Sequence, residues 1–96
     1  MKVIYRALAL DEATAAKIWN RQFELDDQFV EDLEHAIDLV SRFNEIGRRV
    51  NSRGARRILL RQLPYVLYYR VRGNTLVVLA VLHTAQDPRR LRGRLH

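Results

Sequence analysis

Histidine and arginine are the residue types in this chain that are best able to do chemistry. The three histidines, His35, His83 and His96, lack the sequence spacing of metal ligands. Cysteine is absent, so neither a disulfide nor a thiolate metal site can form, and no cofactor is predicted. Glu31 and Glu34 could act as an acid–base pair, but they fall on the polar face of a predicted helix, where solvated surface is the better interpretation.

Arginine is concentrated in the second half of the sequence. Residues 48–96 hold twelve arginines and one carboxylate, Asp87, whereas residues 1–47 hold five Lys or Arg against ten Asp or Glu. The whole chain carries a net charge of +6. Guanidinium groups bind phosphates and carboxylates through paired hydrogen bonds. The basic half therefore predicts an anionic partner, either nucleic acid or an acidic protein, and the alternative is a basic surface without a specific partner.

The elements that position these residues are organised around a predicted β-hairpin at residues 65–83. β-Branched and aromatic residues fill both arms, and Gly73-Asn74 provides a two-residue turn. That turn sets the register, which pairs Arg72 with Thr75, Tyr69 with Val78, Leu67 with Ala80 and Val66 with Val81. Because both faces of the hairpin are rich in apolar residues, we expect it at the centre of a sheet.

Two helices are predicted before the hairpin. The first begins with Asp11 as its N-cap and runs to about Phe23, with Trp19 as a core anchor. The second is capped by Asp26 or Asp27, and its spacing predicts a buried face of Phe29, Leu33, Ala36, Ile37, Val40 and Phe43. Its polar face consists of Glu31, Asp32, Glu34, His35 and Asp38. The short link between the helices predicts an antiparallel helical hairpin.

Strands are also expected at residues 2–8 and 56–63, which makes the order β-α-α-β-β-β. We therefore predict an α+β fold, with the helical hairpin packed on one face of a small, mainly antiparallel sheet. A single domain spans residues 1–96 and ends in a basic, flexible tail from about residue 89 to residue 96. The predicted helix side carries Ile58, Leu60, Leu67, Tyr69, Val71, Leu76, Val78 and Ala80. The predicted open side carries Arg57, Leu59, Arg61, Val66, Tyr68, Arg70, Val77, Leu79, Val81 and His83.

The sequence also gives an expectation about location. Residues 2–6 alternate between charged and apolar types and leave no room for a signal-peptide core. The longest uncharged run, residues 73–86, is too short to span a bilayer. Together with the missing cysteines, this predicts a cytoplasmic protein without a membrane partner.

Two segments of the hairpin resemble a known superfamily. Residues 63–71 (Leu-Pro-Tyr-Val-Leu-Tyr-Tyr-Arg-Val) and 77–88 (Val-Val-Leu-Ala-Val-Leu-His-Thr-Ala-Gln-Asp-Pro) closely resemble the ParE/RelE toxins, and the chain is closer to ParE. The segment at 43–48, which ends the helical pair, also matches, so the resemblance covers nearly the whole chain. Gln86 departs from the pattern, because many relatives carry an arginine there.

The resemblance implies the toxin of a type II toxin–antitoxin, or plasmid stabilisation, system that a cognate antitoxin neutralises. ParE-like members are said to poison DNA gyrase by binding, and this is the leading functional hypothesis, under which the protein is not an enzyme. RelE-like members cleave mRNA on the ribosome, which is the alternative. A third hypothesis is a degenerate toxin that retains only antitoxin binding.

The same resemblance supplies candidate site residues. Val66 and Leu59 stand where the nucleases carry an arginine and a lysine, and neither can stabilise charge. If the chain is a nuclease, the remaining candidates are His83, Arg57, Arg61 and Arg70, with His83 as general acid–base. The expected antitoxin-binding residues lie on the open side: Leu59, Val66, Tyr68, Arg70, Val77, Leu79 and Val81. The expected target-binding residues are His83, Arg89, Arg90, Arg92 and Arg94.

Overall fold

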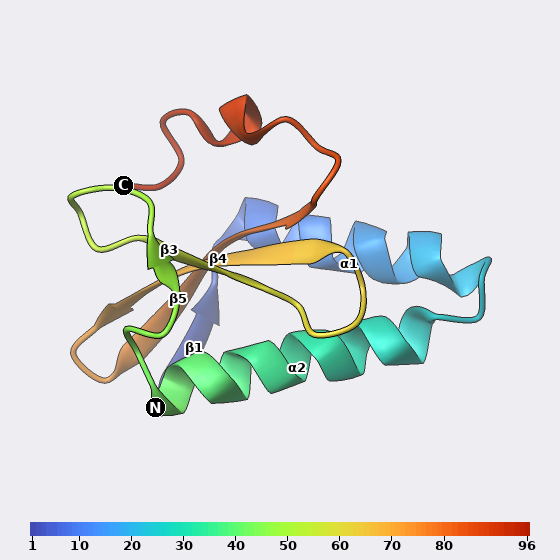
Figure 1. Ribbon diagram of the computed structural model, residues 1–96, viewed down its shortest axis with the longest axis horizontal. Coiled ribbons are helices and arrows are strands. Elements are labelled where there is room, and N and C mark those ends of the chain that lie inside the picture. Colours follow the sequence, from blue (N-terminus) through green and yellow to red (C-terminus); the bar gives the residue numbers. More distant parts are fainter.

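Two helices pack on one face of a five-stranded sheet in the computed structural model, which describes all residues from 1 to 96 (Figure 1). The elements in chain order are β1 (Lys2–Tyr5), α1 (Ala7–Arg21), α2 (Asp26–Arg42), β2 (Arg48–Arg49), β3 (Arg56–Leu59), β4 (Tyr65–Arg72), β5 (Thr75–His83) and the 3₁₀ helix η1 (Pro88–Leu91). The strand order is β1-β5-β4-β3-β2, with β1 parallel to β5 and the other pairs antiparallel. The predicted α+β fold is confirmed, and the structure adds the short strand β2. Neither long helix has the length and apolar composition needed to cross a bilayer.

The β4–β5 hairpin forms as the sequence predicts near its turn and differs farther away. Gly73 has φ of 58°, a left-handed conformation that glycine adopts without steric cost. Arg72 pairs with Thr75 and Tyr69 pairs with Val78, as expected. Leu79 is then an extra residue, because Tyr68 pairs with Ala80. This β-bulge places Leu67 opposite Val81 and Val66 opposite Leu82, so the predicted partners Ala80 and Val81 were wrong.

Because of the bulge, the residues of β5 after Leu79 lie on the opposite faces of the sheet from those predicted. Val81 belongs to the apolar cluster under the helices, whereas Ala80 and Leu82 belong to the cluster on the opposite side. His83 lies beside Tyr65 on the helix side, with the two rings 5.2 Å apart. Ala80 was predicted on the helix side, and Val81 and His83 on the open side; all three placements were wrong because one inserted residue reverses strand alternation.

Helix α2 buries most of the predicted face. Phe29, Leu33, Ala36 and Val40 are buried under the sheet and Ile37 is half-buried, but Phe43 follows the end of the helix and is exposed. The structure caps α2 with Leu25, so the predicted N-cap role of Asp26 or Asp27 was wrong; both lie in the first turn.

Asp32 is the other exception on α2, since the periodicity placed it on the polar face and the structure buries it completely. One of its carboxylate oxygens, Oδ2, accepts hydrogen bonds from the backbone N–H groups of Gln62 at 3.0 Å and Leu63 at 2.7 Å. The carboxylate therefore holds the turn between β3 and β4 against the helix.

Helix α1 begins at Ala7, so Asp11 and Glu12 lie in its second turn and the predicted N-cap at Asp11 was wrong. The helix turns small residues toward the protein interior: its buried residues are Ala9, Ala13, Ala16 and Asn20. Trp19, predicted as a core anchor, is 59% exposed, and Phe23 is also exposed. The short alanine side chains let the helix backbone approach β5 closely, and this packing leaves the larger side chains outside.

The sheet face opposite the helices is covered by the chain itself. Residues 88–96, called here the C-terminal strap, place Leu91 and Leu95 over this face, and Ala55 packs beside them (Figure 1). Asn51 fastens the strap by donating to the carbonyl oxygen of Leu95 at 2.7 Å. The sheet face that was expected to be open is therefore covered, because apolar side chains of residues 88–96 bury it.

This cover changes the surroundings of the residues expected to bind an antitoxin. Val66, Tyr68, Arg70 and Leu79 are buried on the strap side, and Val77 is half-buried. Val81 is buried on the helix side. Leu59 alone of that set is largely exposed, at 58%.

Candidate functional site

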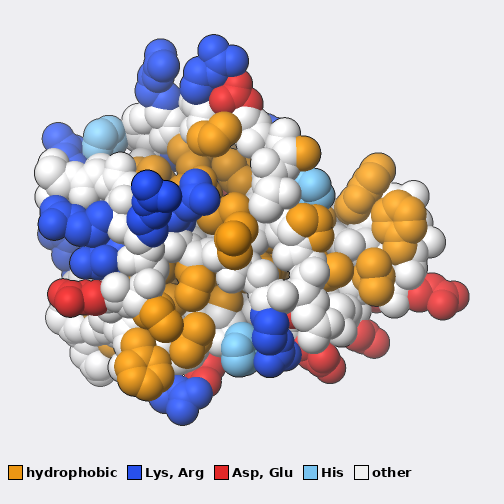
Figure 2. All heavy atoms as spheres, in the orientation of Figure 1, with side chains coloured by type: hydrophobic (Ala, Val, Ile, Leu, Met, Phe, Trp, Pro, Cys, Tyr) orange, Lys and Arg blue, Asp and Glu red, His pale blue; other side chains and the backbone are white.

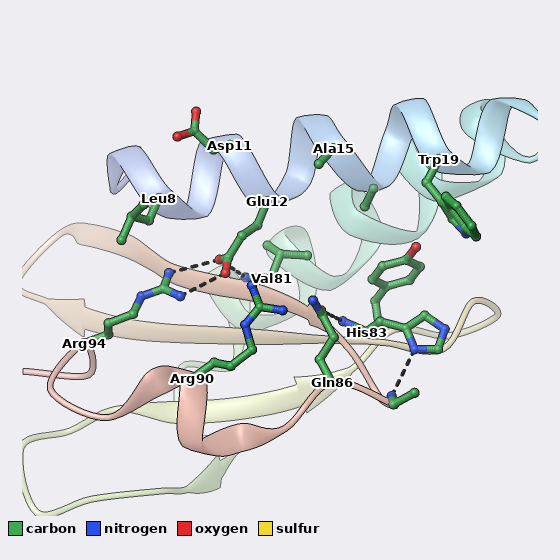
Figure 3. Close-up of a pocket in the computed structure, with 13 residues that line it drawn as sticks. Leu8, Asp11, Glu12, Ala15, Trp19, Val81, His83, Gln86, Arg90 and Arg94 are labelled. Carbon is green, nitrogen blue, oxygen red and sulfur yellow. Dashed lines mark hydrogen bonds and ion pairs between the residues drawn. The ribbon is translucent and has the colours of Figure 1, made fainter.

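A groove of about 820 Å³ runs between α1 and the chain segment that follows β5. Figure 3 shows Leu8 and Trp19 extending from α1, with Gln86 and Arg90 on the opposite wall. Tyr65, Ala16 and Val81 contribute apolar surface to it. Its polar lining consists of Asp11, Glu12, His83, Gln86, Arg90 and Arg94. An open groove with apolar walls and a few charged groups is suited to holding a segment of a partner protein.

The α1 wall of the groove belongs to a larger exposed apolar surface. Leu8, Trp19 and Phe23 are each more than half exposed, and the Trp19 and Phe23 rings lie 6.0 Å apart in edge contact. Figure 2 shows hydrophobic side chains projecting at the right end of the molecule, where α1 connects to α2. Exposed aromatic and aliphatic side chains gathered on one helix indicate a protein-binding surface.

A partly buried ion pair joins the groove to the strap. Arg94 donates to both carboxylate oxygens of Glu12, at 2.9 and 3.0 Å, and the two side chains are only 20% and 18% exposed. Glu12 Oε1 also accepts from the backbone N–H of Val81 at 3.1 Å. This N–H lies beyond the end of β1, which pairs only as far as Val78, so the glutamate replaces a missing strand partner. The hydrogen bonds to Glu12 raise the pKa of the Arg94 guanidinium.

Replacing Glu12 with alanine is expected to lower the free energy of unfolding by roughly 1–3 kcal/mol, because it leaves a partly buried guanidinium and a backbone N–H without their acceptor. Urea unfolding measures the change, and amide exchange should accelerate in the strap. The neighbouring exposed Asp11→Ala is the matched control and should change stability by less than about 0.5 kcal/mol. Equal stability of the two variants would show that the ion pair does not hold the strap.

His83 holds the turn that follows β5. Its ring Nδ1 accepts from the backbone N–H of Ala85 at 3.0 Å, and its own backbone N–H donates to Gln86 Oε1 at 2.7 Å. With Nδ1 used as an acceptor, the neutral ring carries its proton on Nε2 and offers no second lone pair for a general base. Gln86, the position that departs from the family pattern, therefore has a structural partner here.

The four candidates for RNA cleavage are only partly brought together. Arg57 and His83 both border a small depression of about 90 Å³ on the strap side. Arg61 is exposed beyond the end of β3, whereas Arg70 is buried and donates to the backbone oxygen of His96. The depression therefore brings together only Arg57 and His83, and Nδ1 of His83 already accepts a hydrogen bond from Ala85.

The four arginines of the tail also differ in their surroundings. Arg94 is paired with Glu12, and Arg89 is paired with Asp87 at 2.6 Å. Hydrogen bonds from the Arg89 side chain and backbone lower the pKa of Asp87. Arg90 and Arg92 have no carboxylate within 4.0 Å, and Arg90 lines the groove. The expected set of four free target-binding arginines is therefore reduced to two.

Comparison with known proteins decides the family. A family model described as the ParE toxin of the type II toxin–antitoxin system parDE matches residues 3–88. The chain belongs to the ParE toxin family. A solved structure described as the chromosomal ParDE system from P. aeruginosa is 16% identical, with a TM-score of 0.62 over 86% of this chain and 95% of that chain. None of the curated proteins matches the sequence. The predicted family is thus confirmed, and the solved structure shows the same fold.

The α1 wall is the part of this ParE toxin's groove that sequence reasoning missed. His83, Arg90 and Arg94, which were expected to bind the target, line the groove, but Trp19 was assigned to the core. The signal that could have located the wall is the spacing of Ala9, Ala13 and Ala16, which marks one helix face with small residues. The large residues on the other faces then have to lie outside.

Proposed function

We propose that this ParE-family toxin is neutralised by a cognate antitoxin and acts in the cytoplasm by binding and inhibiting DNA gyrase. The observation that carries the proposal is the groove beside α1, where exposed apolar side chains meet an unpaired cation. Leu8 and Trp19 supply the apolar wall, and Arg90 supplies a cation without a carboxylate partner. Such a surface is suited to binding rather than to bond cleavage.

The antitoxin segment that fits this groove is an amphipathic helix with acidic residues along one edge. Its apolar face would lie against Leu8, Ala15 and Trp19, and its carboxylates would face Arg90. The groove is accessible without any rearrangement of the toxin. The sheet-face residues first expected in this role, such as Val66 and Tyr68, could join the interface only if the strap moved away.

Binding to gyrase is supported by family membership and by the surroundings of the nuclease candidates. Val66 and Leu59 are apolar, and Arg61 and Arg70 do not line the depression that His83 and Arg57 border. Target contact is assigned to exposed cations of the strap, Arg90 and Arg92 first, because Arg89 and Arg94 already have carboxylate partners. Exposed charges of this kind accelerate encounter with an acidic surface.

The test measures both candidate activities with the same purified toxin. We expect inhibition of gyrase supercoiling that the antitoxin reverses, and intact mRNA after incubation with translating ribosomes. Codon-positioned mRNA cleavage that disappears in His83→Ala or Arg57→Gln would establish the ribonuclease alternative instead. Full supercoiling at a toxin concentration that arrests growth would remove gyrase as the target.

A further inference from the structure

Six arginines on the strap side of the sheet have no Asp or Glu partner. They come from the β2–β3 hairpin, from β4 and from the residue before α1, and are Arg6, Arg48, Arg53, Arg57, Arg70 and Arg72, called here the arginine surface. The four carboxylate ion pairs of the protein involve Arg21, Arg42, Arg89 and Arg94 instead. Figure 2 shows a group of basic side chains at the left of the molecule, the side on which Figure 1 places the loop between β2 and β3.

Strand pairing brings like charges face to face within this surface. Arg48 on β2 lies directly opposite Arg57 on β3. Arg57 in turn lies opposite Tyr68, which belongs to the apolar cluster beneath the strap, so both arginines are on the strap side. Like charges directly opposite each other on paired strands are destabilising. An anion bound across the pair would remove this cost.

Three arginines of this surface lie around His96. Arg6 and Arg70 both donate to the backbone oxygen of His96, and Arg53 Nη1 lies 2.7 Å from His96 Nδ1. Arg70 is only 5% exposed. Burial, followed by the charges of Arg6, Arg72 and Arg53, lowers the pKa of the Arg70 guanidinium from its usual value, as expected for a buried cation beside other cations.

We propose that the arginine surface binds the phosphate backbone of duplex DNA without sequence preference. Guanidinium groups match phosphate oxygens in geometry, and binding by several of them releases condensed counterions from the DNA. No aromatic side chain is available there for stacking unpaired bases, since Tyr68 is buried beneath the strap. The surface also presents no helix that could read a groove, so contacts are restricted to the backbone. This activity goes beyond the proposed function and does not require gyrase to be the target.

The test is fluorescence anisotropy of a labelled duplex of about 20 base pairs, titrated with full-length toxin between about 50 and 200 mM salt. Four exposed arginines of the surface, Arg6, Arg48, Arg53 and Arg72, predict a slope of log K against log salt of about −3 to −4. Arg48→Gln removes no hydrogen bond of the structure and should reduce the slope by about 1. Arg48→Gln with Arg53→Gln should reduce it by about 2 and weaken binding roughly tenfold at low salt.

Lys17→Gln with Arg42→Gln removes the same charge from the helices and is the matched control, expected to change affinity less than about twofold. Equal losses in the two double variants would overturn the proposal, as would no binding at the lowest salt or equal affinity for single-stranded DNA. All variants should keep their affinity for the antitoxin, because the groove is unchanged. Failure of DNA binding is therefore distinguishable from failure of the proposed function.

Discussion

Trp19→Ala is expected to lower the toxin's affinity for its antitoxin at least 30-fold while leaving the fold unchanged. The indole lines the groove and is 59% exposed, so its removal creates no internal cavity. Tryptophan that becomes buried at the centre of an interface commonly contributes 2 kcal/mol or more, and about 1.4 kcal/mol corresponds to a factor of ten in affinity. Isothermal titration calorimetry with the purified antitoxin measures the loss, and thermal unfolding reports on the fold.

The adjacent residue provides a matched control for this prediction. Ile18 is 58% exposed on the same helix but does not line the groove. Ile18→Ala removes a comparable exposed apolar side chain, so it should leave antitoxin affinity within about threefold of the unmodified toxin. If Ile18→Ala weakened binding as much as Trp19→Ala, the antitoxin would contact a different face of α1. Unchanged affinity in Trp19→Ala would exclude the groove as the binding site.

Asp32→Ala is expected to lower the free energy of unfolding by roughly 3 kcal/mol. Asp32 is fully buried, and its Oδ2 is the acceptor for the backbone N–H groups of both Gln62 and Leu63. Alanine would leave these two donors without a partner and release the turn before β4. Urea unfolding followed by tryptophan fluorescence measures the effect at neutral pH.

Two further variants separate the hydrogen bonds from general effects of charge on α2. Asp32→Asn keeps the side-chain shape and one carbonyl acceptor, so it should lose less stability than Asp32→Ala. Glu31→Ala removes an exposed carboxylate from the same helix and should change stability by less than about 0.5 kcal/mol. A loss in Asp32→Ala no larger than that in Glu31→Ala would show that the turn folds without this carboxylate.

Local signals in the sequence predicted the fold because each acts over a few residues. The Gly73-Asn74 turn and its β-branched arms specified the β4–β5 hairpin, and the spacing from Phe29 to Val40 specified the buried face of α2. The motifs of the hairpin also identified the family. The sequence also singled out His83, Arg90 and Arg94 as target-binding residues; all three line the groove, and their role in target binding stays a prediction.

The rest of the site depends on contacts between distant segments. The bulge at Leu79 moved His83 to the helix side, where the helix-side groove lies, and no local pattern marked it. The spacing of α2 places Asp32 among the polar residues. Its carboxylate is buried because it accepts hydrogen bonds from the backbone of Gln62 and Leu63, which are distant in the sequence. Trp19 is exposed because α1 packs its alanines against the sheet.

The sequence by itself determined the α+β class, the order of the main elements and the concentration of arginine in the second half, because these follow from periodicity, turn residues and composition. The family was indicated by the resemblance of its hairpin motifs. Only the tertiary structure decided which face of α1 and which face of β5 beyond Leu79 are buried. Leu91 and Leu95 cover a sheet face that the sequence left open, and Glu12 binds Arg94 across 82 positions of the chain. The physical reason is that burial depends on which segments meet in space, and a single bulge or a covering strap changes this without changing any local pattern.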